Sequence, residues 1–233
     1  MRRVKKDCKF GGTVRIRNLL FTSAIGAGLA AVAWAGAFNF NLVTNPGAET
    51  GDLTGWTITS NGGDGWASVT YNPHSGTRSF GTSWDWCTRS QEIDLIAKGF
   101  TAAELDAAPP VVFEEWICSY SDYPAYYFIR FELLDAGHNV IQYWEHGTQS
   151  APVYLSNNTS WFAESRTFTG YGSGLRYVKM IDGGKDRLRL RYWRGAHFDD
   201  ASIKLVPEPS GLATAVVLGL AGLGASQLLG RKH

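Results

Sequence analysis

Short runs of alternating apolar and polar residues, separated by clusters of turn-forming residues, repeat through the middle of this 233-residue chain. A period of two places successive side chains on opposite faces of a strand, and Gly, Asn and Asp between the runs favour turns. Many short strands with regular turns are typical of an all-β domain, a sandwich or a barrel. The runs that predict strands are Val111–Phe113, Tyr126–Leu134, Val140–Trp144, Arg176–Ile181, Leu188–Trp193 and 201–205.

The segments between these runs predict the turns. They are 61–65, 135–137, 156–158 and 182–184, each rich in Gly, Asn or Asp. One helical turn is predicted over Thr101–Ala107, because Thr101 and Glu104 have the spacing of a capping box.

The N-terminal segment has the pattern of a secretory signal. Seven Lys and Arg residues precede an apolar run from Leu19 to Val32, and Ala33–Ala35 or Ala35–Ala37 offers small residues for cleavage. We therefore expect residues 1–37 to be a signal peptide with a signal helix, rather than part of the fold.

The C-terminal segment has three parts in order: the motif Pro207-Glu208-Pro209, an apolar run from Gly211 to Leu229, and a basic end. The run is close to the roughly 20 residues that a transmembrane helix needs, and the basic end would stay cytoplasmic. This order resembles the PEP-CTERM sorting signal of Gram-negative bacteria, in which a membrane-bound exosortase acts at the Pro-Glu-Pro motif. The resemblance implies that residues 206–233 are a sorting signal with a transmembrane helix. The body would be exported to the cell envelope, cell surface or extracellular matrix, as it would with an ordinary C-terminal anchor.

The remaining body, 38–205, has the size of one domain. The formal net charge of +1 is dominated by the basic leader, so the body is mildly acidic and nucleic acid is not an expected partner. The body holds Cys87 and Cys118, which in an oxidising compartment form either one disulfide or two buried thiols.

The body has few candidates for catalysis. It contains no zinc-protease motif, no nucleophile elbow and no phosphate-binding loop, and its histidines lack metal-ligand spacing. Glu114-Glu115 and Asp199-Asp200 are adjacent acids, which on a strand point to opposite faces. We therefore expect a protein that is not an enzyme and has no cofactor.

The acids near the two ends of the body are candidate ligands of a metal ion. Where first and last strands lie side by side, Glu49 and Asp52 would approach Asp199 and Asp200, and their oxygens would suit a structural calcium ion. The alternative is a set of solvated acids at strand ends.

Aromatic residues are plentiful, and eight tryptophans fall in the body. Most are expected in the core, but rings in loops beside polar groups suit the apolar face of a sugar. The candidates at or near turns are Trp84, Tyr120, Tyr123, Tyr192 and Trp193, with packing as the alternative for each.

The order and spacing of many short motifs hold over nearly the whole body. They include Asn41–Pro46, Leu53–Trp56, Asn61–Trp66, Phe80–Cys87, Gln91–Leu95, Gly99-Phe100, Glu104–Asp106, Pro110, Glu115-Trp116, Leu133-Leu134, Trp161, Phe168–Gly172, Gly174–Val178 and Asp182–Asp186. These motifs resemble the F-box-associated (FBA) domain family. The resemblance implies a jelly-roll sandwich with a galactose-binding-like fold. In F-box proteins this domain selects substrates, and some members bind the inner core of high-mannose N-glycans.

The resemblance also implies site residues. The family's loop aromatic corresponds to Trp84 and its loop acid to Asp122. Its aromatic pair falls on Arg189-Leu190 without a gap, or on Tyr192-Trp193 with a three-residue shift. A signal peptide stands where family members have an F-box, so we expect no Skp1-type partner and no ubiquitin-ligase role.

Two functions remain open. In the first, the body binds a polysaccharide or glycan, with Trp84, Tyr192 and Trp193 stacking on sugar while Asp122 and Arg194 hydrogen-bond its hydroxyls. In the second, it is a structural or adhesive surface protein that makes protein contacts, with its aromatics buried.

Overall fold

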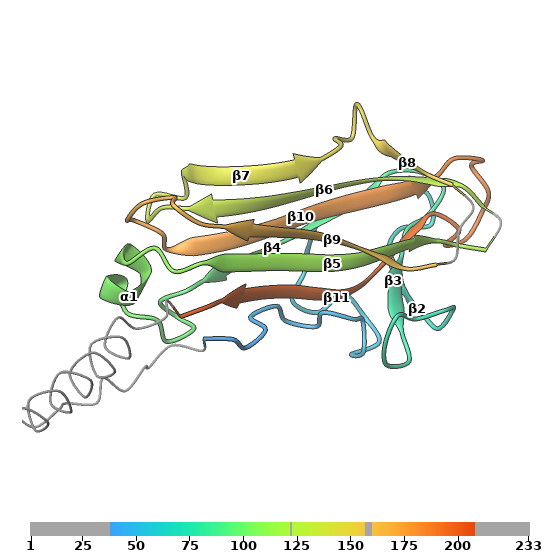
Figure 1. The fold of residues 1–233 in the computed structure, drawn as a ribbon. Helices are drawn as coiled ribbons and strands as arrows, with labels where there is room; N and C mark the ends of the chain where they lie inside the picture. Colours follow the sequence, from blue (N-terminus) through green and yellow to red (C-terminus); the bar gives the residue numbers. More distant parts are fainter. Residues whose placement is uncertain (1–37, 122, 157–159, 208–233) are drawn as a thin grey trace, which may run out of the picture. The chain divides into compact units, whose positions relative to one another are not determined.

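The computed structural model describes residues 38–121, 123–156 and 160–207, which form two antiparallel sheets packed face to face (Figure 1). Sheet A has, in spatial order, β1 (Thr57–Asn61), β4 (Cys87–Asp94), β10 (Tyr177–Asp186), β6 (Ala125–Leu134) and β7 (Val140–His146), with β8 (Val153–Leu155) also paired to β6. Sheet B has β2 (Ala67–Val69), β3 (Ser79–Gly81), β11 (Ala196–Leu205), β5 (Val111–Ser119) and β9 (Phe162–Phe168). The predicted all-β sandwich is confirmed.

The single helix among the described residues, α1 (Ala102–Asp106), is where the capping box predicted it. The Thr101 side chain accepts a hydrogen bond from the Glu104 N–H, and the Glu104 carboxylate accepts one from the Thr101 N–H. This reciprocal pair satisfies two amides that a helix start leaves open. No helix in the described ranges has the length and hydropathy needed to span a bilayer.

The predicted strand Leu188–Trp193 is wrong, and so is the predicted turn at 182–184. β10 continues through Gly183 and Gly184 and ends at Asp186. A Cβ at Gly183 would lie 2.7 Å from the Cys87 carbonyl oxygen and 2.8 Å from the Phe128 ring. These glycines therefore let neighbouring strands approach closely, which moves the turn to residues 187–195.

The start of the domain lies along the end of β11 (Figure 1). The Asn39 N–H donates to the Leu205 carbonyl at 2.9 Å, and the Leu42 N–H donates to Ile203 at the same distance. The first segment of the domain and its last strand thus lie side by side.

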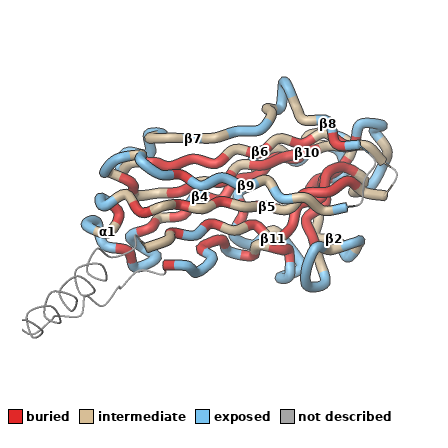
Figure 2. Tube along the Cα trace, in the orientation of Figure 1, coloured by how far each residue is buried: buried red, intermediate tan, exposed pale blue. Residues whose placement is uncertain are grey.

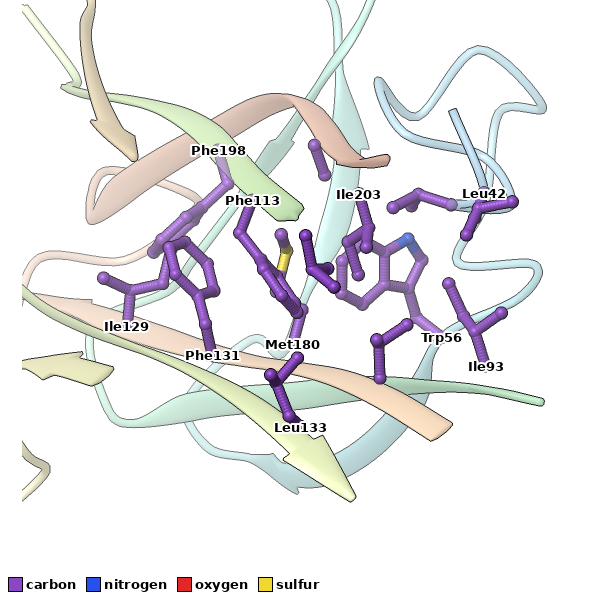
Figure 3. Packing of buried hydrophobic residues seen from close by; sticks show 14 of the residues in the cluster. Leu42, Trp56, Ile93, Phe113, Ile129, Phe131, Leu133, Met180, Phe198 and Ile203 are labelled. Atoms are coloured by element: carbon purple, nitrogen blue, oxygen red, sulfur yellow. The ribbon is translucent and has the colours of Figure 1, made fainter. Parts of the chain in front are cut away.

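The core fills the space between the sheets, whose inner faces are buried (Figure 2). Phe113 of β5 stacks on Phe131 of β6 with ring centroids 4.9 Å apart, which joins the two sheets directly (Figure 3). Trp56 lies at the other side of the same cluster. Such contacts between inner faces provide most of the stabilisation of a sandwich.

A charged group is buried inside this core. Arg89 of β4 is fully buried, with its Nε 3.0 Å from Asp182 Oδ1 and an Nη 2.8 Å from Glu115 Oε1. Burial raises the pKa of Asp182 to about 6 and raises that of Glu115 well above its usual range. Arg89 and Asp182 belong to sheet A and Glu115 to sheet B, so this ion pair ties the sheets together.

Cys87 and Cys118 are free and buried. They lie in different sheets, on β4 and β5, and the disulfide offered by the sequence is not formed. The alternative interpretation, two buried thiols, describes the structure.

Candidate functional site

A pocket of about 390 Å³ opens at one end of the sandwich, where β2, β3, β5 and β11 meet the β10–β11 loop. Its wall is mainly aromatic, with one arginine. The lining residues are Ser68, Val69, Thr70, Tyr71, Tyr120, Tyr192, Trp193, Arg194 and His197. A concave site with aromatic walls and a few polar groups is typical of a small-ligand site.

The rings of the pocket come from distant parts of the chain. Tyr71, which follows β2, lies 4.1 Å from Tyr120 at the end of β5, measured between ring centroids. His197 of β11 lies 5.6 Å from Tyr120 and 6.1 Å from Tyr71. The three rings support one another, so the pocket wall is built before any ligand arrives.

The β10–β11 loop is shaped by one buried acid. Asp186 accepts hydrogen bonds from the backbone N–H groups of Leu188 at 2.7 Å and Leu190 at 2.6 Å. The Tyr192 N–H donates to Asp64 at 2.7 Å, while Tyr192 itself has a φ of 74°. Such a positive φ is costly for a tyrosine, and it turns the chain so that Tyr192 is 61% exposed.

His197 is the buried floor of the site. Its Nε2 lies 3.1 Å from the Trp193 carbonyl oxygen, so Nε2–H is the donor and Nδ1 the acceptor. Burial lowers the pKa of His197 to about 4, and the ring is therefore neutral near neutral pH. His197 Nδ1 and Trp193 Nε1 are buried without a hydrogen-bond partner among the described residues.

Arg194 provides the charge of the pocket. Its guanidinium carbon lies 4.8 Å from the Tyr123 ring centroid and 6.0 Å from that of Tyr192. It forms no ion pair with a described residue, so its donors are available to a ligand.

The predicted site residues divide into two groups. Tyr192, Trp193 and Arg194 come together at the pocket with Tyr120, whereas Arg189 and Leu190 do not line it. Trp84 does not line the pocket. It lies over the turn at 62–65, where a Cβ at Gly63 would be 2.9 Å from Trp84 Nε1. Asp122 lies outside the described residues.

Sequence reasoning missed Tyr71 and His197. Tyr71 precedes Asn72-Pro73 in an ordinary turn segment, and His197 is an isolated histidine at the start of a strand. No local pattern distinguishes either residue, since only the pairing of β2 with β3 and of β3 and β5 with β11 brings them together.

The predicted calcium site is not formed. Glu49 accepts hydrogen bonds from the Thr77 and Arg78 N–H groups, while Asp199 accepts from the His74 N–H. Asp200 Oδ2 lies 2.6 Å from His74 Nδ1. Asp199 and Asp200 thus share donors from His74 and Ser75, while Glu49 is bound by other residues. No group of three or more His, Cys, Asp or Glu in the described ranges is placed to hold a metal ion.

A family model described as the F-box associated region matches residues 35–205. F-box only protein 2 of Bos taurus is 32% identical over 177 residues, which cover 72% of this chain and 59% of that protein. F-box only protein 6 of Homo sapiens is 32% identical over 179 residues, again with 72% of this chain and 59% of that protein covered. The chain spans about three fifths of the length of these curated relatives.

Two solved structures are similar in fold. The enzymatically active domain of bacteriophage CBA120 tailspike protein 4 has a TM-score of 0.50 at 11% identity, with 71% of this chain and 21% of that chain covered. TmCBM61 in complex with beta-1,4-galactotriose has a TM-score of 0.47 at 18% identity, with 71% of this chain and 99% of that chain covered. At 11% identity, the similarity to the tailspike domain shows a shared sandwich fold and no shared function.

Proposed function

Because the chain belongs to the F-box associated region family, we propose that its aromatic pocket binds a saccharide. The domain would be a non-catalytic carbohydrate- or glycoprotein-binding module of the galactose-binding-like jelly-roll type. The preformed cluster of Tyr71, Tyr120 and His197 lies next to Arg194, which has no ion-pair partner among the described residues, and this arrangement carries the proposal.

The chemistry of the wall suits a sugar. A pyranose has an apolar face that packs on a flat ring and hydroxyl groups that need donors and acceptors at its edge. Tyr192 is exposed enough to stack on such a face, and Arg194 offers several N–H donors to hydroxyls.

The saccharide would belong to a glycoprotein or to a polysaccharide of the cell surface. Each aromatic contact adds about 0.5–1.5 kcal/mol beyond the area that it buries, so a pocket with few rings binds weakly as a single copy. Activity of the F-box proteins as whole proteins, including a Skp1-type partner, is no part of this proposal.

Export forms the second part of the proposal. The signal-like segment 1–37 and the PEP-CTERM-like segment 206–233 would take the domain across the inner membrane of a Gram-negative bacterium, with exosortase as a partner during sorting. Pro207 is described, whereas Glu208 and Pro209 lie outside the described residues. Cell fractionation tests this part: a protein that stays in the cytoplasm in a host with an exosortase contradicts it.

A glycan array that carries bacterial polysaccharides and N-glycan cores tests the binding. We expect the full-length protein to bind a subset of glycans, and Trp193→Ala to lose at least tenfold in affinity for them. Tyr143→Ala is the matched control, since Tyr143 is an exposed ring on β7, outside the pocket. Equal affinity of wild type and Trp193→Ala would disprove the site. A folded protein that binds no glycan would favour the structural or adhesive function.

A further inference from the structure

Apart from the pocket, a row of aromatic and basic side chains crosses the outer face of sheet A. Lys185 of β10 is the register partner of Tyr126 of β6, which is in turn the partner of Tyr154 of β8. Direct partners in antiparallel strands point to the same face. Trp86, just before β4, extends the row beyond Lys185, and Arg187 adds to it beside Tyr154.

The row is continuous. Lys185 Nζ lies 5.1 Å from the Trp86 ring centroid and 5.9 Å from that of Tyr126. The rings of Tyr126 and Tyr154 are 5.9 Å apart, and the guanidinium carbon of Arg187 is 5.5 Å from Tyr154. The row thus runs from the residue before β4 across β10, β6 and β8, which are neighbours in that order in sheet A. With strands about 4.8 Å apart, it spans roughly 14 Å.

Among the described residues, the two cations of the row have no acidic partner, unlike other cations on the same face. Arg130 is paired with Glu132 and Glu145, and Lys179 is paired with Glu92. Lys185 and Arg187 form no ion pair with a described residue and contact aromatic rings instead. Their positive charges are therefore available to a ligand outside the domain.

The surface at this end of the row is hollowed. A cavity of about 340 Å³ is lined by Tyr126, Tyr154 and Arg187, and Tyr154 is 52% exposed. Phe128 packs against Trp86 with ring centroids 5.8 Å apart and lies over Gly183. The rings are thus held in place and present their faces without a ligand.

The surrounding charge is also positive. Residues 185–194 contain five Lys and Arg and one acid, Asp186, in a body that is acidic as a whole. Asp186 is buried and its oxygens accept backbone N–H groups, so it does not neutralise the surface. A local excess of one sign attracts ligands of the other sign.

We propose that the row formed by Trp86, Lys185, Tyr126, Tyr154 and Arg187 is a binding site for an anionic polysaccharide, one whose sugars carry carboxylate or sulfate groups. Rings alternating with cations match a chain of stacked sugars with charged substituents. A row that crosses three strands suits an extended polymer better than a single sugar. The site shares no residue with the pocket at the β10–β11 loop, so it does not depend on saccharide binding there.

Titration calorimetry of the full-length protein tests this site. The probes are oligogalacturonate, oligoalginate and heparin oligosaccharide, with a neutral galactan oligomer of matched length as control. We expect at least one anionic probe to bind more weakly as salt is added, because salt screens exposed charges. We expect Lys185→Gln with Arg187→Gln to reduce that affinity at least tenfold, and Trp86→Ala or Tyr154→Ala to reduce it severalfold.

Two variants separate the two sites. Lys179→Gln removes a charge from the same face but one already paired, and it should leave anion binding unchanged. Trp193→Ala should also leave it unchanged while it removes binding of the pocket's glycan. The proposal is overturned by a folded wild type that binds none of the three anionic probes, by a Lys185/Arg187 double variant with undiminished affinity, or by loss of anion binding in Trp193→Ala.

Discussion

The guanidinium carbon of Arg89 lies 3.7 Å from the ring centroid of Trp56, in the middle of the sandwich and out of reach of solvent. Phe80 lies 3.9 Å away at the same guanidinium, and Asp182 and Glu115 accept its N–H groups. A cation with aromatic neighbours and two buried acids is stable as a set, because each member offsets the burial of another.

Loss of Arg89 should therefore cost much of the stability. We expect Arg89→Met to lower the free energy of unfolding by about 3–5 kcal/mol, because two carboxylates lose their buried partner. The loss should be smaller in acid, where both carboxyls are protonated. Urea unfolding measures it, with Arg130→Met as a control whose partly exposed ion pair contributes about 0–1 kcal/mol. Equal losses in the two variants would contradict the assigned role.

The buried His197 predicts a loss of stability in acid. Its pKa is about 4 in the folded state, against 6.5 ordinarily. Between these values the unfolded ring takes up a proton and the folded ring does not, so stability falls as the pH is lowered from about 6.5 to about 4. In His197→Asn this contribution should vanish from unfolding curves recorded across that range. A difference between the wild-type and variant curves that does not vary with pH would refute the prediction.

Asp199 should make the stability depend on pH in the opposite direction. Burial raises its pKa from 3.8 to about 6, so the folded state holds the proton more tightly than the unfolded state. Its stabilising contribution is complete below pH 3.8 and is lost as the pH rises through about 6. In thermal unfolding, the stability of Asp199→Asn relative to that of the wild type should increase as the pH rises over that range. A gain as the pH falls would show that the sign is wrong.

Asp186 should fix the shape of the pocket loop. In Asp186→Asn one of the two backbone N–H groups, that of Leu188 or of Leu190, loses its acceptor. We expect a stability loss of about 1–3 kcal/mol and a shifted NMR signal of the Trp193 indole. Asp85→Asn is the control, because Asp85 is exposed and bonds only the neighbouring Trp86 N–H among described residues. An unshifted indole signal would mean that the loop keeps its shape without the carboxylate.

The thiols should be inert in the folded protein. Burial raises the pKa of Cys87 to about 11 and that of Cys118 to about 12, so neither forms the reactive thiolate near neutral pH. In a Cys8→Ala background, iodoacetamide should label neither cysteine before urea is added and both afterwards, as read by mass spectrometry. Labelling of the native protein would contradict their burial.

Local signals in the sequence predicted local structure well. The capping box of Thr101 and Glu104 needs only neighbouring residues, and α1 begins where it predicts. Alternation located β6 and β7 nearly to the residue, because one face of β6 is buried and Ile141 and Trp144 of β7 are partly buried against the core. The turn predicted at Gly183 and Gly184 was wrong for a physical reason. Glycine is common in turns because its φ is free, but in β10 it is needed because it lacks a Cβ and lets neighbouring strands approach closely.

The sites depend on contacts that no local signal contains. The aromatic content predicted that rings would meet a ligand, and Tyr192, Trp193 and Arg194 do reach the pocket. Their neighbour Tyr71 is more than a hundred residues away along the chain, and the acidic partners of Arg89, Glu115 and Asp182, are 26 and 93 residues away. A buried arginine could not be predicted from its neighbours in sequence, since its acids lie on other strands.

The hydrogen bond from Asn39 to Leu205 has a consequence for how this domain can be joined to other proteins. Its first and last residues leave from the same point, at the end of β11 that lies farthest from His197. The module can therefore be spliced into a surface loop of a host, or re-threaded as a circular permutant, without stretching either chain. With ten residues of strand in between, the end that carries the pocket would project about 30 Å from the junction.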